Sequence, residues 1–208
     1  MSRAPPTVFV VDDDISVREA LEALIRSEGW ATETFDSAEA FLERPRAIAP
    51  SCLVLDVTLP RLNGLDLQKR LADRPEMPII FITGHGDVPM TVKAMKAGAV
   101  EFLTKPFSDE VLLSALRQAL ERSHSLIKQE EELELLRQRH ASLSRREREV
   151  MSLVALGRLN KQIGFTLGIS EITVKAHRGR VMRKMHALTI VELINMATKL
   201  RLGDPIDR

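Results

Sequence analysis

Four short apolar runs and a fifth, more exposed strand-like run, separated by helix-like segments, constrain the first 122 residues more than any other feature. Between these runs, apolar residues recur at three- and four-residue spacing, which is typical of amphipathic helices. Strands that alternate with helices form a parallel sheet with helices on both faces. The pattern therefore predicts an α/β domain built on five parallel strands. The runs are Val8–Val11, Thr32–Phe35, Leu53–Leu55, Ile79–Ile82 and Val100–Leu103.

The chain as a whole divides into three predicted parts. Residues 5–122 form the α/β domain, for which the flavodoxin-like strand order 2-1-3-4-5 is the best match. Residues 123–142 are highly charged and lack Gly and Pro, so we expect a helical linker there. Residues 143–208 contain short amphipathic segments and no strand pattern, which predicts an all-α domain of four helices.

Composition limits where the protein acts and what it contacts. No apolar stretch approaches the ~20 residues that a membrane helix needs, so no membrane partner is expected. Cys52 is the single cysteine and the N-terminus lacks a signal-peptide pattern, which together favour a cytoplasmic location. Residues 1–142 carry a net charge of −6 and residues 143–208 one of +7. This asymmetry indicates a nucleic-acid contact in the C-terminal part.

Polar residues follow the ends of four predicted strands. Because the carboxyl ends of parallel strands meet at one edge of a sheet, we expect these side chains to share one pocket. Carboxylate oxygens suit a hard divalent cation such as Mg²⁺ or Mn²⁺, and an ammonium group suits a phosphoryl group. The pocket residues are Asp12, Asp13, Asp56, Thr83 and Lys105.

The chemistry of these groups suggests a role for each. Asp13 and Asp56 can ligate the metal, with Asp12 orienting a water molecule. Asp56 can act as a carboxylate nucleophile that forms an acyl phosphate, while Lys105 neutralises the phosphoryl charge and Thr83 donates a hydrogen bond to it. A lone Asp at a strand end more often caps a helix, so the prediction rests on the five residues together.

Residues 5–122 resemble the receiver domain of two-component response regulators. The matching residues are Asp12, Asp13, Asp56, Thr83, Phe102 and the pair Lys105-Pro106. The resemblance implies that a sensor histidine kinase passes a phosphoryl group to Asp56, and that Thr83 and the aromatic switch residue Phe102 then move inward. It also implies that the backbone carbonyl of Thr58 joins the three carboxylates around the metal.

Leucines at heptad spacing mark the predicted linker. Leu126, Leu133, Leu136 and Leu143 fit the a and d positions of a short coiled coil, although too few heptads are present for a firm assignment. A solvated helical spacer and a dimerising helix both fit this pattern.

A helix–turn–helix is predicted between Lys161 and Met185. Ser144 and Glu147 form a capping box that begins the helix before it. Gly168-Ile169-Ser170 would make the turn, and the following helix carries several basic residues, as a recognition helix in the major groove does. A solvated basic helix is the plainer interpretation of the charge alone.

Residues 143–200 also resemble the LuxR-type DNA-binding domain, and both resemblances together indicate the FixJ-like subgroup of transcriptional activators. The matching segments are Leu143–Val150, Gly157, Asn160–Ile163 and Ile169–His177. The resemblance implies that Lys175 and Ala176 contact base edges. The implied phosphate contacts are Lys161, Thr173, Arg178, Arg180 and Lys184. Within the subgroup, residues 89–98 are similar to regulators of aromatic-compound catabolism.

Two glycines depart from the LuxR-type pattern. Gly164 stands where the family usually has alanine, and glycine costs a helix interior about 1 kcal/mol relative to alanine. Gly179 lies inside the predicted recognition helix, where relatives often carry a longer side chain. It therefore weakens that helix and removes a contact.

These observations predict a phosphorylation-dependent transcription factor. The phosphorylated receiver would dimerise, place two recognition helices on promoter half-sites about one DNA turn apart, and activate RNA polymerase. No enzymatic activity is expected beyond slow self-phosphotransfer and self-dephosphorylation at Asp56. One alternative is an aspartyl-phosphate phosphatase, although Thr58 holds the place of its general acid. Another is a receiver-type interaction module whose C-terminal helices bind RNA polymerase or another protein without sequence-specific DNA binding.

Overall fold

The computed structural model describes residues 5–46, 49–84 and 86–202, so the predicted C-terminal limit at residue 208 lies outside the described residues. The chain divides into two compact units, Met1–Lys128 and Gln129–Arg208.

A five-stranded parallel sheet forms the centre of the first unit. The strand order β2-β1-β3-β4-β5 confirms the flavodoxin-like prediction. Val11 on β1 pairs with Leu55 on β3, so the two strands end side by side and Asp12 and Asp56 follow at the same edge. The strands are β1 (Thr7–Val11), β2 (Ala31–Phe35), β3 (Ser51–Asp56), β4 (Ile79–Thr83) and β5 (Glu101–Thr104).

Side-chain caps set the starts of the helices that connect these strands. At four of them a side-chain oxygen accepts a hydrogen bond from a backbone N–H of the first turn, which would otherwise have no partner. These caps are Asp14, Ser37, Asn63 and Asp87. The helices are α1 (Ile15–Ser27), α2 (Ala38–Glu43), α3 (Gly64–Arg70), α4 (Val88–Lys96) and α5 (Asp109–Ala141).

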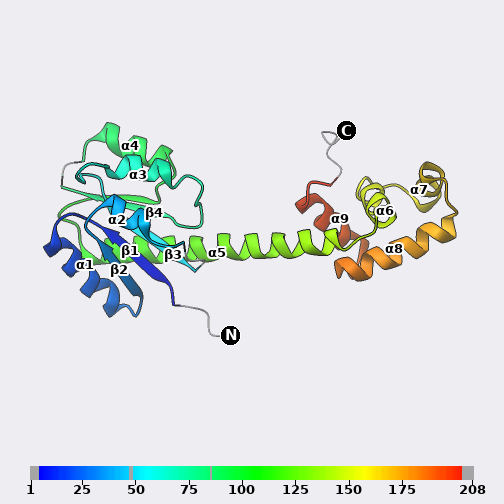
Figure 1. Cartoon of the computed structure of the whole chain (residues 1–208), viewed down its shortest axis with the longest axis horizontal. Coiled ribbons are helices and arrows are strands. Elements are labelled where there is room, and N and C mark those ends of the chain that lie inside the picture. The colour runs from blue at the N-terminus through cyan, green and yellow to red at the C-terminus, as the bar shows by residue number, and fades with distance from the viewer. Residues whose placement is uncertain (1–4, 47–48, 85, 203–208) are drawn as a thin grey trace. The chain divides into compact units, whose positions relative to one another are not determined.

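The sheet is buried on both faces by two separate apolar clusters. One face packs Phe9, Leu55 and Phe81 against α2, α3 and α4. The other packs Val10 and Ile80 against α1 and the first part of α5. Figure 1 shows α3 and α4 on the side of the sheet away from α1. Burial on both faces explains why the three central strands β1, β3 and β4 are almost continuously apolar instead of alternating, whereas the edge strand β2 is more polar and partly exposed.

The described residues of the second unit form helices joined by short loops and contain no strand, as predicted. Its core joins Leu136 of α5 to the inner faces of the following four helices. Ser144 and Glu147 form the predicted capping box, and Gly168 ends the first helix of the helix–turn–helix with φ +66°. The helices are α6 (Arg145–Ala155), α7 (Asn160–Leu167), α8 (Glu171–Met185) and α9 (Ile190–Lys199).

Helix α5 contributes residues to both units. The hydroxyl of Ser123 is fully buried, donates to the Glu76 carbonyl at 2.5 Å and accepts from the Ser51 N–H at 3.0 Å. Near the end of α5, Leu136 is 7% exposed in the core of the second unit. The boundary between the two units falls between Lys128 and Gln129, inside the expected 123–142 linker. Residues at the two ends of that segment belong to the core of one unit or the other.

None of the helices in the described residues is both long and apolar enough to span a bilayer. Helix α5 has the length, but its exposed surface is charged.

Candidate phosphoryl-acceptor site and nucleic-acid interface

Three carboxylates converge at the edge where β1 and β3 end. One oxygen from each of Asp12, Asp13 and Asp56 lies within 4.8 Å of the others. Asp12 and Asp56 are buried, whereas Asp13 is exposed. A cluster of oxygen donors with one open side matches the way hard divalent cations are held in proteins, with a few carboxylates and retained water. The residues present therefore fit a divalent metal.

The carboxylate of Asp56 is held by two contacts. Its Oδ1 accepts from the backbone N–H of Thr58 at 2.9 Å, and its Oδ2 accepts from Nζ of Lys105 at 3.2 Å. Lys105 follows β5 directly, and its peptide bond to Pro106 is cis. The side chain of Asp56 is only 9% exposed, so its contacts leave a small open approach beside the ammonium group.

Lys105 also joins Asp56 to Asp12. Its Nζ lies 2.6 Å from Oδ2 of Asp12. Burial raises the pKa of Asp12, although the hydrogen bond from Lys105 opposes that change. Burial lowers the pKa of Lys105, but the hydrogen bond and charge of Asp12 and the charge of Asp56 outweigh it, so its pKa is raised overall. One ammonium thus faces two buried carboxylates, and an added cation would relieve the excess negative charge.

The two predicted switch residues lie on neighbouring strands. Thr83 ends β4 and is fully buried, and Phe102 on β5 is half-buried. The ring of Phe102 lies 6.0 Å from that of Phe81, measured between centroids. A Cβ added to Gly86 would lie 3.0 Å from Phe102 and 3.3 Å from Thr83. Gly86 therefore packs closely against the side chains of Thr83 and Phe102, with no room for a larger residue unless one of them shifts.

Two residues that support the site were missed by the sequence reasoning. Arg18 on α1 donates from Nη1 to the backbone carbonyl of Asp12 at 2.7 Å. Gly64 begins α3 so close to β3 that an added Cβ would overlap the carbonyl oxygen of Asp56. The Asn63-Gly64 pair is a turn signal, but the sequence alone does not show which backbone atom the turn approaches.

The second unit exposes a basic helix. On α8, Thr173, Lys175, Ala176 and Arg180 are exposed, and Lys161 is exposed on α7. Lys175 lies 3.6 Å from Glu171, an exposed pair one turn apart that holds its ammonium weakly. These predicted DNA contacts are therefore available at the surface of the unit.

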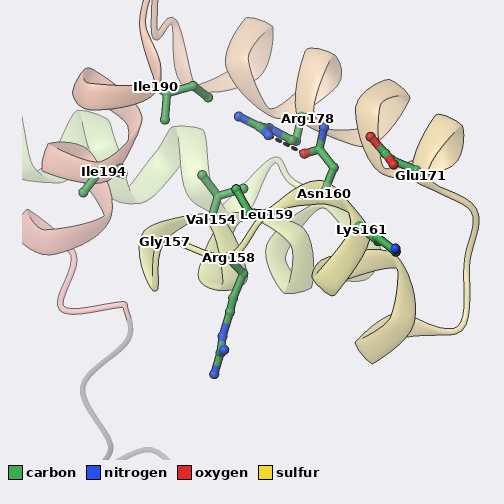
Figure 2. A pocket seen from close by; sticks show the side chains of 10 residues that line it. All are labelled: Val154, Gly157, Arg158, Leu159, Asn160, Lys161, Glu171, Arg178, Ile190 and Ile194. Atoms are coloured by element: carbon green, nitrogen blue, oxygen red, sulfur yellow. Dashed lines mark hydrogen bonds between the residues drawn. The ribbon is translucent and has the colours of Figure 1, made fainter.

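The remaining two predicted DNA contacts, Arg178 and Lys184, bond within the unit. The guanidinium of Arg178 donates to the side-chain oxygen of Asn160 at the start of α7. Both residues line a hollow of about 470 Å³ (Figure 2). Nζ of Lys184 lies 2.7 Å from Oε2 of Glu147 and 3.2 Å from the Ser142 carbonyl. Both cations thus connect α8 to neighbouring segments. Figure 2 shows that Arg158 and Lys161 extend outward instead.

The two unusual glycines differ in their surroundings. A Cβ added to Gly164 would lie 2.7 Å from the carbonyl oxygen of Ile169 in the turn, whereas one added to Gly179 meets nothing within 4 Å. Gly164 therefore permits a close approach between α7 and the turn. Gly179 leaves open surface on α8.

Comparison with known families decides between the alternatives that the sequence left open. Residues 8–117 match the response regulator receiver domain, and residues 141–197 match the bacterial regulatory proteins of the luxR family. The chain belongs to the response regulator family. It is a transcription factor that combines a receiver domain with a LuxR-type DNA-binding domain. This match confirms the predicted class over the two alternatives, the phosphatase and the interaction module without sequence-specific DNA binding.

Individual relatives support the same family over nearly the whole chain. The response regulator protein TodT of Pseudomonas putida is 46% identical over 202 residues, which cover 97% of this chain and 89% of TodT. The transcriptional regulatory protein FixJ of Azorhizobium caulinodans is 44% identical and covers 91% of this chain and 90% of FixJ. The solved structure of response regulator StyR is 48% identical with a TM-score of 0.83, covering 94% of this chain and all of that one. These matches support the FixJ-like subgroup.

Proposed function

We propose that Asp56 accepts a phosphoryl group from a sensor histidine kinase and that this modification controls DNA binding. The observation that carries the proposal is the Lys105 ammonium that bridges the buried carboxylates of Asp12 and Asp56 at the strand ends. An Asp56 oxygen would attack phosphorus while the bond from phosphorus to the donor nitrogen breaks. Lys105 would then hold a phosphoryl oxygen. Thr58, whose N–H would also donate to it, lies in the loop after β3, and Thr83, whose hydroxyl would do the same, ends β4.

A bound Mg²⁺ or Mn²⁺ would neutralise the charge on the transferred phosphoryl group. Asp12, Asp13 and Asp56 would hold the metal, with the Thr58 carbonyl as a fourth protein ligand. Of the three acidic residues, Asp13 is the exposed one, so it borders the open side through which the metal would enter. The same site would give at most slow self-phosphotransfer and self-dephosphorylation.

A groove beside the pocket offers a docking surface for the kinase. It holds about 500 Å³ and is lined by Lys105, Pro106, Phe107 and the α1 residues Val17, Ala20 and Leu24. Ile15, at the start of α1, is 60% exposed. A partner helix that packed into this groove would bring its phosphohistidine next to Lys105 and Asp56.

The last two βα units of the receiver carry the proposed dimer surface. Val88, Val92 and Met95 on α4 are 77%, 44% and 41% exposed, and Val111 at the start of α5 is 48% exposed. Apolar side chains gathered on one helix are typical of a surface that is covered in another state. Phosphorylation would favour that state only through contacts that differ between the two states.

The DNA contacts are proposed for α8 and the start of α7. Lys175 and Ala176 would contact base edges, while Lys161, Thr173 and Arg180 would contact phosphates. Arg178 and Lys184 stay predicted phosphate contacts, and each would have to share its cation with an internal partner. The DNA target implies a cytoplasmic protein that acts with RNA polymerase. The similarity of residues 89–98 to regulators of aromatic-compound catabolism stays a prediction.

Mass spectrometry of the intact full-length chain tests the phosphorylation step. With acetyl phosphate and Mg²⁺, the wild type should gain one phosphoryl group, and Asp56→Asn should gain none. Asp66→Asn is a matched control, because Asp66 is a carboxylate on α3 that pairs with Lys69 and is not among the three acidic residues of the pocket. Labelling of Asp56→Asn at the wild-type rate would contradict the proposal.

A further inference from the structure

Helix α8 has two faces of different character. Val174 and Val181 are buried in the core of the second unit. The opposite face follows the helical spacing i, i+4 and i+7 through Ile172, Ala176 and Gly179, all of which are exposed. Between residues 172 and 179, the outer face of this strongly basic unit is therefore uncharged and apolar along its centre, and the exposed Arg183 ends this strip.

Ile172 is the unusual member of this face. It is 79% exposed, although it is a large branched aliphatic residue in the first turn of the helix. The side chain has no role in the unit's core, and it lies in the turn that recognition helices direct at base edges. Burial of a side chain this exposed would occur in a complex, not in the unit itself.

The charges beside this face indicate which kind of molecule would cover it. Lys175 and Arg180 are exposed on either side of the centre line, and Ser170 caps the helix from the preceding turn. A strip of apolar side chains between two cations matches a major groove, where phosphates lie along both edges and base edges form the floor. The apolar group that a groove floor offers is the C5-methyl of thymine.

We propose that Ile172 is a specificity residue that reads a thymine C5-methyl group in each half-site. Ala176, one turn on, and Gly179, whose missing side chain leaves nothing within 4 Å, allow the helix to approach the groove floor closely enough for this contact. The proposal rests on the proposed role of α8 as the recognition helix. It adds a preference for T at one position, beyond any that Lys175 or Ala176 would impose at the positions they contact.

Uracil substitution tests the contact, because uracil lacks only the methyl group. Duplexes bound by the full-length chain are first selected from a random library. Each thymine of the selected site is then replaced by uracil, and binding is measured for the wild type, Ile172→Ala and Ile172→Val. Removing one buried methyl should weaken wild-type binding about fourfold at one position in each half-site. Ile172→Ala should bind the T and U duplexes equally, and Ile172→Val should retain part of the difference.

Two controls separate this inference from the proposed function. Lys175→Ala should weaken binding to every duplex, and if it does not, α8 is not the recognition helix. Leu156→Ala removes an aliphatic side chain that is 55% exposed at the end of α6 and should keep the full response to uracil. Circular dichroism should show wild-type melting for Ile172→Ala, since its side chain is exposed.

Either of two results would overturn the inference while leaving the DNA-binding role of α8 intact. In one, Lys175→Ala weakens binding but the wild type and Ile172→Ala respond identically to uracil at every position. In the other, Ile172→Ala binds all duplexes normally but loses transcription activation, which would assign Ile172 to a protein contact.

Discussion

Glu147 shows how one side chain can serve two structural roles. Its Oε2 accepts from the Ser144 N–H at 2.8 Å, completing the capping box of α6, and lies 2.7 Å from Nζ of Lys184 on α8. The hydrogen bond from Lys184, together with that from Ser144, lowers the pKa of Glu147 to about 2. The carboxylate therefore connects the start of α6 to the end of the recognition helix.

This contact predicts an acid-sensitive contribution to the stability of the second unit. Since the pKa of Glu147 is lowered on folding, its stabilising effect is complete above its ordinary value of 4.5 and is lost as pH falls from there through about 2. Glu147→Gln should lower the local free energy of unfolding by on the order of 2 kcal/mol at pH 7, and the difference from wild type should shrink below pH 4.5. Amide hydrogen exchange in α6 and α8, corrected for the intrinsic exchange rate at each pH, measures this difference in the local free energy of unfolding.

Glu192 supplies the matched control for this prediction. It accepts from the Leu188 N–H at the start of α9 but has no hydrogen-bonded lysine among the described residues. Glu192→Gln should therefore change exchange only slightly. Equal effects of the two substitutions at pH 7 would mean that Lys184 adds nothing to the capping box.

The acidic pocket could be predicted from sequence at the residue scale because each member lies at the end of a strand or within two residues after it. Strand order then brings Asp12 beside Asp56 without further information. The supporting residues could not be predicted in this way. Gly64 touches a backbone carbonyl, and Ser123 bonds to segments 47 and 72 residues away, so no local pattern marks them.

At the scale of single elements, Ser123 fixes α5 against the sheet. Ser123→Ala would leave the buried Ser51 N–H and the Glu76 carbonyl without their partner, which costs about 1–3 kcal/mol. Ser125→Ala changes an exposed residue of the same helix, so any effect of helix propensity is shared by both variants. Urea unfolding followed by fluorescence of Trp30, which packs on the receiver core, compares them. Equal midpoints for the two variants would contradict the anchoring role.

The two glycines of the helix–turn–helix give opposite expectations for the same substitution. Gly179→Ala should stabilise the second unit by about 1 kcal/mol, since alanine is the better helix former and open space surrounds the site. Gly164→Ala should gain less or destabilise, because its Cβ would displace the Ile169 carbonyl in the turn. Scanning calorimetry of the full-length chain measures both. An equal gain in stability for both variants would contradict this expectation, because it would mean that the Ile169 carbonyl can shift at no cost.

Helix boundaries in the second unit were accessible from sequence because capping residues mark them. Ser144, Ser170 and Thr189 each accept a hydrogen bond from the first turn of the helix that follows them. The cost expected for Gly164 relative to alanine came from helix propensity, which describes an isolated helix. It therefore left out the close approach of Gly164 to the Ile169 carbonyl. The heptad leucines were ambiguous for a related reason: Leu136 and Leu143 are buried within the second unit, a use that the spacing does not distinguish from a coiled coil.

For the whole molecule, charge separates the two proposed activities. The acidic N-terminal part carries the phosphoryl-acceptor pocket, and residues 143–208, with a net charge of +7, carry the DNA contacts. A DNA complex held by lysine and arginine weakens as salt rises, with a slope of about −0.9 per neutralised phosphate on a log–log plot. The receiver does not need to touch DNA to control this binding, since dimerisation alone would raise the affinity for a two-half-site promoter.

The affinity of the full-length chain for a selected two-half-site duplex, measured by fluorescence anisotropy with and without acetyl phosphate in Mg²⁺, tests the central claim most directly. The wild type should gain roughly 5- to 150-fold in affinity, the range of a typical coupling between two sites. Asp56→Asn should bind at the basal level under both conditions, and Lys175→Ala should bind weakly under both. A gain in Asp56→Asn as large as that of the wild type would contradict the account.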